Sequence, residues 1–183
     1  MHDDAISSGE QAPPLHPDLR PVAFLVGTWR GEGVGGYPTI ESFRYGQEIV
    51  LGHAGKPMLS YRSRTWALDD GRPLAMESGF WRPQPDGGIE VVLAHATGFV
   101  EVSVGTVDGP KIELISDVVA RTASAKEVSA VHRLYGIVAG KLMYAIDMAA
   151  VGQALQPHLS AELERVPGTG LEPEPPSDGA GTA

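Results

Sequence analysis

The segment that contains Pro157 and His158 is the clearest candidate for chemistry in this sequence. Proline disfavours helical dihedrals at the residue before it and suits the first position of a helix. We therefore expect a helix from Pro157 to about Val166, with His158 in its first turn. The positive end of the helix dipole disfavours an imidazolium, so His158 would be mostly neutral and able to ligate a metal. The alternative is that His158 is an ordinary polar residue of a C-terminal helix.

His95 is a second candidate, because it ends a run of alternating apolar residues. Ile89, Val91 and Leu93 share one face of the predicted strand with His95. A histidine on the apolar side of a sheet is either a core residue satisfied by a neighbour or a polar group that lines a ligand cavity. The residues alone leave both alternatives open.

Motifs for several other chemistries are missing. The glycine-rich run at residues 31–36 is not followed by a helix and lacks the lysine of a Walker loop, which argues against a nucleotide site. Gly-x-Ser-x-Gly, the nucleophile elbow of many hydrolases, does not occur. None of the six histidines lies at metal-pair spacing from another, so a structural zinc site is not indicated.

Composition is typical of one soluble globular domain, with 42% hydrophobic and 20% charged residues in 183. The net charge of −9, without clustered Lys or Arg, argues against nucleic acid and anionic membranes as partners. The absence of cysteine excludes disulfides and thiolate chemistry and fits a reducing compartment. Because neither a signal peptide nor a membrane-spanning segment is evident, we expect a cytoplasmic protein.

The elements that must position the two histidines are predicted from a period-two pattern between Thr28 and Val151. Turn residues recur about every ten positions, as at Asp86-Gly87-Gly88 and Asp108-Gly109, and indicate consecutive hairpins. The predicted fold class is all-β, an antiparallel up-and-down β-barrel of about ten strands that leaves no free edge. A short helix at Pro17 to Val26 would stand at the N-terminal end, and the helix that contains His158 at the C-terminal end.

Nine strands are predicted along this stretch, at residues 28–35, 40–51, 58–68, 74–82, 88–95, 99–107, 111–120, 127–138 and 141–150. A barrel of this size can hold one small-to-medium ligand. The barrel domain is expected at residues 16–166, between disordered tails at 1–15 and 167–183.

Alternation also predicts which side chains point into the barrel. Besides the face of His95, two faces are expected inside: Leu142, Tyr144, Ile146 and Met148 on one strand, and Ile112, Leu114 and Val118 on another. Four arginines are expected on the outer, solvated face: Arg30, Arg44, Arg62 and Arg64.

Several segments, taken in order, resemble the nitrobindin family of haem-binding β-barrels. The most specific is residues 27–33, which fits the family pattern G-x-W-x-G-x-G. Others follow at the family's spacing, at residues 37–40, 53–57, 77–83, 96–102, 148–152 and 155–159. The resemblance extends from about Leu19 to Val166 and implies a ten-stranded barrel.

The resemblance further implies haem b as the cofactor, with His158 as the proximal ligand of its iron. The second ring nitrogen of His158 would be held by a carbonyl or a carboxylate. Thr39 and Lys126 match family positions that contact the haem, Lys126 as a charge toward a propionate; an ordinary solvated lysine in a turn is the alternative at Lys126. Three further residues are implied to line the pocket, namely His95 on its distal side, Leu74 and Met148.

In this family ferric haem binds nitric oxide, and some members isomerise peroxynitrite to nitrate. The resemblance therefore implies a haem-dependent peroxynitrite isomerase that scavenges reactive nitrogen species, with peroxynitrite and nitric oxide as its small-molecule ligands. One alternative is a nitric oxide carrier or sensor without turnover. Another is a lipid- or fatty-acid-binding barrel, which would place arginines inside the cavity, where the pattern shows none clearly inward. The outer face of the barrel is a candidate for a homodimer contact.

Overall fold

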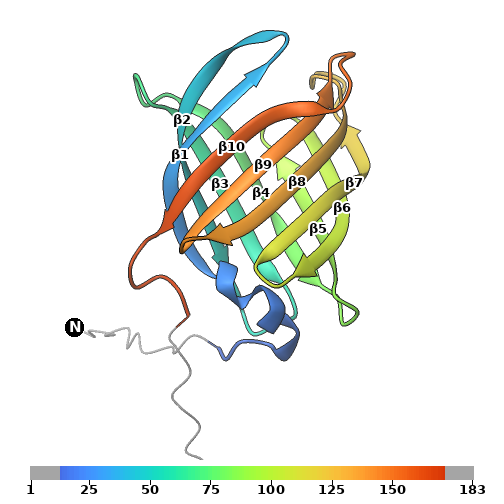
Figure 1. Ribbon diagram of the computed structural model, residues 1–183. Coiled ribbons are helices and arrows are strands. Elements are labelled where there is room, and N and C mark those ends of the chain that lie inside the picture. Colours follow the sequence, from blue (N-terminus) through green and yellow to red (C-terminus); the bar gives the residue numbers. More distant parts are fainter. Residues whose placement is uncertain (1–12, 172–183) are drawn as a thin grey trace, which may run out of the picture.

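A computed structural model describes residues 13–171, which form a closed antiparallel barrel of ten strands (Figure 1). Each strand pairs with the next one along the chain, and β1 pairs with β10 to close the barrel. The predicted all-β class and up-and-down topology are confirmed. The predicted tails fall largely on residues 1–12 and 172–183, outside the described residues. Near the C-terminal boundary, the hydroxyl of Thr169 accepts a hydrogen bond of 2.9 Å from the backbone N–H of Thr28.

The ten strands are β1 Gly27–Tyr37, β2 Ile40–Gly52, β3 Leu59–Ala67, β4 Pro73–Pro83, β5 Gly88–His95, β6 Phe99–Asp108, β7 Lys111–Arg121, β8 Val128–Val138, β9 Lys141–Ala150 and β10 Gln156–Arg165. The nine strands predicted from the sequence match β1 to β9 to within two residues at each end. A 3-10 helix, η1, spans Pro17–Leu25 and confirms the short helix expected at the N-terminal end. In the described part of the chain, no helix is long and apolar enough to cross a membrane.

The predicted C-terminal helix is wrong, because this segment is strand β10. Leu159, Ala161 and Leu163 alternate with polar residues, so the segment also carries a period-two pattern. The free edges of β1 and β9 need a partner, and β10 satisfies both. Pro157 is tolerated because the pairing with β9 shifts by one residue between Pro157 and Leu159. The helix-dipole argument for His158 therefore does not hold, and its chemistry depends on other contacts.

The interior face follows the prediction except beyond a β-bulge. Leu142, Tyr144 and Ile146 are buried, as are Ile112 and Leu114. Val118, expected inside, is instead 50% exposed. The pairing of β6 with β7 shifts so that Asp117 is an extra residue, which reverses the alternation and turns Val119 inward. The four arginines predicted on the outer face are exposed.

One end of the barrel is sealed by η1 (Figure 1). Leu19, Val22 and Leu25 are buried, and the indole of Trp29 donates a hydrogen bond of 2.8 Å to the Leu25 carbonyl. The guanidinium of Arg165 lies 4.3 Å above the Trp29 ring. Trp29 and Arg165 are paired at this end of β1 and β10, whereas His158 lies toward the opposite end. The open end of the barrel is therefore where a ligand can enter.

Candidate functional site

His158 projects from the shifted pairing at the start of β10, beside the end of β1. Its Nδ1 atom lies 3.0 Å from the carbonyl oxygen of Gly36. A carbonyl only accepts hydrogen bonds, so Nδ1 carries the hydrogen and the lone pair of Nε2 is left available. This contact is the imidazole's one hydrogen bond within residues 13–171. It matches the expectation that a carbonyl would hold the second ring nitrogen, and it orients the ring as metal-binding histidines require.

Tyr37 supports the same imidazole from the side. The two rings meet edge to face, with their centroids 5.4 Å apart. The Tyr37 hydroxyl accepts a hydrogen bond of 2.9 Å from the Ala150 N–H and donates one of 3.0 Å to the Met148 carbonyl. Tyr37 therefore joins β1 to the end of β9, and the ring of His158 packs against an anchored neighbour.

Two cavities open at this end of the barrel and meet at His158. The first, which we call the histidine cavity, has a volume of about 490 Å³ and is lined by His158 and His95 together with Thr39, Lys126 and Met148. The second, the tyrosine cavity, has a volume of about 860 Å³ and is lined by four tyrosines, namely Tyr45, Tyr61, Tyr135 and Tyr144. His158, Lys126 and Leu159 line both cavities.

The structure thus brings the six residues selected from the sequence to one end of the barrel. Five of them line the histidine cavity, and Leu74 lines the tyrosine cavity. Thr39 and Lys126 are exposed at the rim, in the β1–β2 and β7–β8 connections, whereas Met148 is half-buried. This placement shows that these residues can face one ligand. Their individual roles stay predictions.

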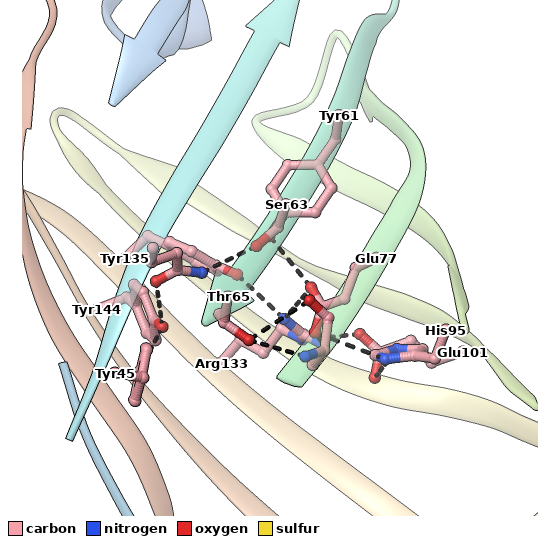
Figure 2. Close-up of polar contacts among 12 residues, drawn as sticks. Tyr45, Tyr61, Ser63, Thr65, Glu77, His95, Glu101, Arg133, Tyr135 and Tyr144 are labelled. Carbon is pink, nitrogen blue, oxygen red and sulfur yellow. Dashed lines mark hydrogen bonds and ion pairs between the residues drawn. The ribbon is translucent and has the colours of Figure 1, made fainter. Parts of the chain in front are cut away.

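Sequence reasoning missed a cluster of charged residues inside the barrel (Figure 2). Glu77 on β4, Glu101 on β6 and Arg133 on β8 all point inward, and Glu101 is completely buried. Two nitrogens of Arg133 lie 3.3 Å from the two carboxylate oxygens of Glu77. The Nε atom of Arg133 lies 2.7 Å from Glu101 Oε1. In the sequence, this cluster is indicated only by one charged residue at an inward-facing position of the period-two pattern in each of these three strands.

Electrostatics keep the Glu77–Arg133 pair ionised. Burial opposes the charged form of Glu77, but the Arg133 guanidinium outweighs it and the pKa of Glu77 is lowered. Burial likewise opposes the charge of Arg133, but Glu77 foremost raises its pKa well above the ordinary value. Arg133 is therefore the inward arginine that the sequence pattern did not reveal. Its charge is engaged by carboxylates of the protein.

One part of the tyrosine cavity wall is a chain of neutral polar side chains. Tyr45 and Tyr144 share a hydrogen bond of 2.7 Å between their hydroxyls, and Tyr144 donates one of 2.6 Å to Gln47 Oε1 (Figure 2). The amide of Gln47 in turn donates to the Ser63 hydroxyl at 2.9 Å. Burial raises the pKa of Tyr45 to about 12, so this phenol stays protonated at neutral pH.

One glycine explains why Tyr45 can lie in this wall. A Cβ atom on Gly33 would come within 2.5 Å of the Tyr45 hydroxyl and 2.3 Å of its ring. Any larger residue at position 33 would therefore displace the phenol. The third glycine of the G-x-W-x-G-x-G segment makes room for the cavity wall on the neighbouring strand.

Comparisons with known proteins agree with this arrangement. The family model described as "THAP4-like, heme-binding beta-barrel domain" matches residues 18–165. A protein from Arabidopsis thaliana named peroxynitrite isomerase Rv2717c is 49% identical over 158 residues, which cover 85% of this chain and 93% of that protein. A peroxynitrite isomerase from Nocardioides sp. is 54% identical over 155 residues, covering 82% of this chain and 94% of that protein.

Two further similarities concern a nitrobindin-like protein and a solved structure. A ferric nitrobindin-like protein from Kineococcus radiotolerans is 47% identical over 176 residues, which cover 84% of this chain and 98% of that protein. The crystal structure of Rv2717c from M. tuberculosis superimposes with a TM-score of 0.79 at 44% identity, covering 84% of this chain and 99% of that one. These matches cover 82–85% of this chain and 93–99% of the similar proteins, so they extend over whole barrels.

Proposed function

The chain belongs to the THAP4-like, heme-binding β-barrel family, and on that premise we propose that Nε2 of His158 ligates the iron of haem b. The observation that carries this proposal is the hydrogen bond from Nδ1 of His158 to the Gly36 carbonyl. It fixes the tautomer whose Nε2 has a lone pair, in a ring that lines both cavities.

The residues around His158 fit a haem. The histidine cavity has apolar walls from Val128, Val131, Ile146 and Leu159, which suit a porphyrin face. Lys126 at the rim suits a propionate as a point charge, and Thr39, which lines the same cavity, offers a hydroxyl. When bound, haem supplies an iron with one open coordination position for a small nitrogen oxide.

We further propose that the protein isomerises peroxynitrite to nitrate and that it also binds nitric oxide at ferric iron. Relatives about 50% identical are named peroxynitrite isomerase, and one that is 47% identical is named a ferric nitrobindin-like protein. His158 would hold the cofactor, and the apolar wall would exclude water and keep the two halves of the anion together during rearrangement. Because the chain lacks cysteine, a reducing cytoplasm is the setting that we propose.

Stopped-flow decay of peroxynitrite tests the catalytic proposal. We expect the ferric protein to accelerate decay and to raise the yield of nitrate. His158→Ala should lose the acceleration, whereas His132→Ala, on the outer face of β8, should keep it. Nitric oxide binding without faster decay would instead identify a carrier or sensor, which would use the same residues.

A lipid carrier is the less favoured function, because the interior offers no free cation among the described residues. Arg133 is the arginine that lies buried, and it is paired with two carboxylates. To pair with Arg133, a fatty-acid carboxylate inside the barrel would have to displace one of them, at the cost of an unpaired buried charge.

A homodimer is the assembly that we propose, formed through the outer face of β4 to β7. Apolar residues on the outer side of these strands are neighbours in the sheet: Phe80 faces Val92, the half-buried Val102 faces Val118, and Val104 faces Ile115. A contiguous apolar patch of this kind marks an interaction surface. Because the patch has little charge of its own, a second copy of the same patch is a suitable partner.

A further inference from the structure

His95 lies between two buried carboxylates at the wall of the histidine cavity (Figure 2). Its Nδ1 atom is 3.5 Å from Glu77 Oε1, and its Nε2 atom is 3.7 Å from Glu101 Oε2. The imidazole stacks on Phe99 with ring centroids 3.7 Å apart and planes inclined by 14°. Its side chain is 9% exposed, so the ring is held in place and still borders the cavity.

The charges around His95 do not balance without a proton. Glu77 and Glu101 contribute two negative charges, and Arg133 contributes one positive charge. The side chain of Glu101 is 0% exposed and that of Arg133 is 3% exposed. An uncompensated charge at this depth is strongly unfavourable. Two other groups that could supply a positive charge lie elsewhere, because Lys126 is exposed at the rim and His158 is on β10 beside Gly36. The groups at this cluster that can hold a compensating proton are therefore His95 and Glu101.

Hydrogen-bond partners indicate where this proton lies. Glu77 already accepts hydrogen bonds from Tyr61 at 3.1 Å and from Arg133. Among the described residues, in contrast, neither oxygen of Glu101 has a hydrogen-bond partner, and neither does Nε2 of His95. The Nε atom of Arg133 is close to Glu101 Oε1, but its N–H does not point at that oxygen. At 3.7 Å, Nε2 of His95 and Oε2 of Glu101 are within ion-pair distance, so a proton on either group would remove the uncompensated charge of this pair.

We propose that His95 and Glu101 together hold one proton at neutral pH, and that Nδ1–H of His95 donates a hydrogen bond to a small anion in the histidine cavity. Within residues 13–171, Nδ1 makes no hydrogen bond, although Glu77 Oε1 is 3.5 Å away, and Glu77 already has Tyr61 and Arg133 as donors. Rearrangement of peroxynitrite to nitrate leaves the number of protons unchanged, so the stored proton is not consumed. The identity of the anion rests on the function proposed above, whereas the stored proton does not.

The first test uses haem-free protein labelled with ¹⁵N in histidine and ¹³C in the carboxyl groups of glutamate. At pH 7 we expect either both nitrogens of His95 or the carboxyl group of Glu101 to report the extra proton. In Glu101→Gln the extra proton should be absent, and His95 should show one neutral tautomer with its hydrogen on Nδ1. Wild-type protein with a neutral His95 and an ionised Glu101 would overturn the proposal, whatever the outcome with haem.

His132 provides a matched control on the outer face. It also lies between two carboxylates, 3.1 Å from Glu113 and 3.4 Å from Asp147, but its side chain is 28% exposed. Its signals should not change in Glu101→Gln. If they do change, the Glu101→Gln variant has altered the whole barrel, and His95→Gln is used instead. In His95→Gln, the carboxyl signal of Glu101 should still report one proton, because the charge imbalance remains. An ionised Glu101 in this variant would contradict the charge balance.

The second test measures azide binding to the ferric haem-loaded protein. His95→Gln should weaken azide binding about tenfold or more, as expected for loss of a hydrogen bond to a charged ligand. His132→Gln should bind azide as tightly as wild type. Wild-type affinity in His95→Gln would exclude donation by Nδ1. Failure of the haem proposal would show itself separately, as a protein that takes up no haem in any variant.

Discussion

The ring of Tyr37 meets the imidazole of His158 edge to face at 5.4 Å, while the Tyr37 hydroxyl bonds the backbone of Met148 and Ala150. Tyr37→Phe keeps the ring but leaves the Ala150 N–H without this acceptor, which should cost about 1–3 kcal/mol of unfolding free energy. Haem affinity should fall as well, because the end of β9 is no longer tied to β1. Denaturant unfolding and a haemin titration check both effects. Unchanged stability would show that water replaces the hydroxyl.

Val151 has a strained backbone at the edge of the histidine cavity. Its φ is 47°, in the left-handed region that β-branched residues rarely adopt. Val151→Asn should raise the unfolding free energy by about 0.5–1 kcal/mol, because asparagine tolerates this conformation. Ala139, with a φ of 51° in the β8–β9 turn, is the control position far from the cavity, and Ala139→Asn should give a similar gain. A loss of stability in Val151→Asn alone would mean that the valine side chain has a packing role that outweighs the strain.

Arg133 should be among the residues whose loss is least tolerated. Arg133→Gln leaves Glu77 and Glu101 buried without their guanidinium, which should destabilise the fold by about 3–5 kcal/mol at pH 7. Arg82→Gln breaks an exposed pair with Glu90 on the outer wall and should have little effect. Equal effects of the two substitutions in denaturant unfolding would contradict the charge arrangement described for the interior.

The pH dependence of stability follows from Glu77. Its pKa is lowered in the folded protein, so the unfolded chain takes up the proton first as pH falls. The stabilisation from Glu77 should be fully present above its ordinary pKa of 4.5 and lost as pH falls through the lowered folded value. In Arg133→Gln the lowering disappears, so the defect should be largest at neutral pH and shrink toward pH 4. Unfolding curves at several pH values measure this, and a defect that grows in acid would contradict it.

If the protein is a homodimer through the apolar patch, a substitution that disrupts the patch should halve the mass of the particle in solution. Ile115→Glu places a charge in the apolar patch on the outer face of β4 to β7 and should convert a dimer to a monomer in sedimentation measurements. Val138→Glu, at an equally exposed position in the β8–β9 hairpin, should leave the mass unchanged. A wild-type protein that is monomeric at high concentration would exclude this assembly.

Most of the fold could be predicted because most turns contain residues that mark a turn in the local sequence. Glycine or aspartate occurs in most of the connections between β1 and β9, and alternation identifies the inward face within most strands. β10 was misassigned because Leu159, Leu163 and Val166 also fit a helical spacing, and only the unpaired edge of β1 decides between the two. Val118 was misplaced because the bulge in β7 depends on the pairing with β6.

The charged interior could not be predicted for a related reason. Glu77, Glu101 and Arg133 lie on three strands that are not adjacent in the barrel, and each looks like a surface residue in its own segment. Only the closure of the barrel brings them within bonding distance. The prediction for His158, in contrast, does not depend on the predicted helix, because a held Nδ1 and an available Nε2 are also obtained in a strand, through the Gly36 carbonyl.

The most direct test of the account is the visible absorption spectrum of the purified protein titrated with haemin. Wild-type protein should take up one haem per chain and show a Soret band typical of histidine-ligated ferric iron. His158→Ala should lose or shift that band, and His132→Ala should match wild type. A wild-type protein that stays colourless, or a His158→Ala spectrum identical to wild type, would contradict the assignment of His158 as the iron ligand.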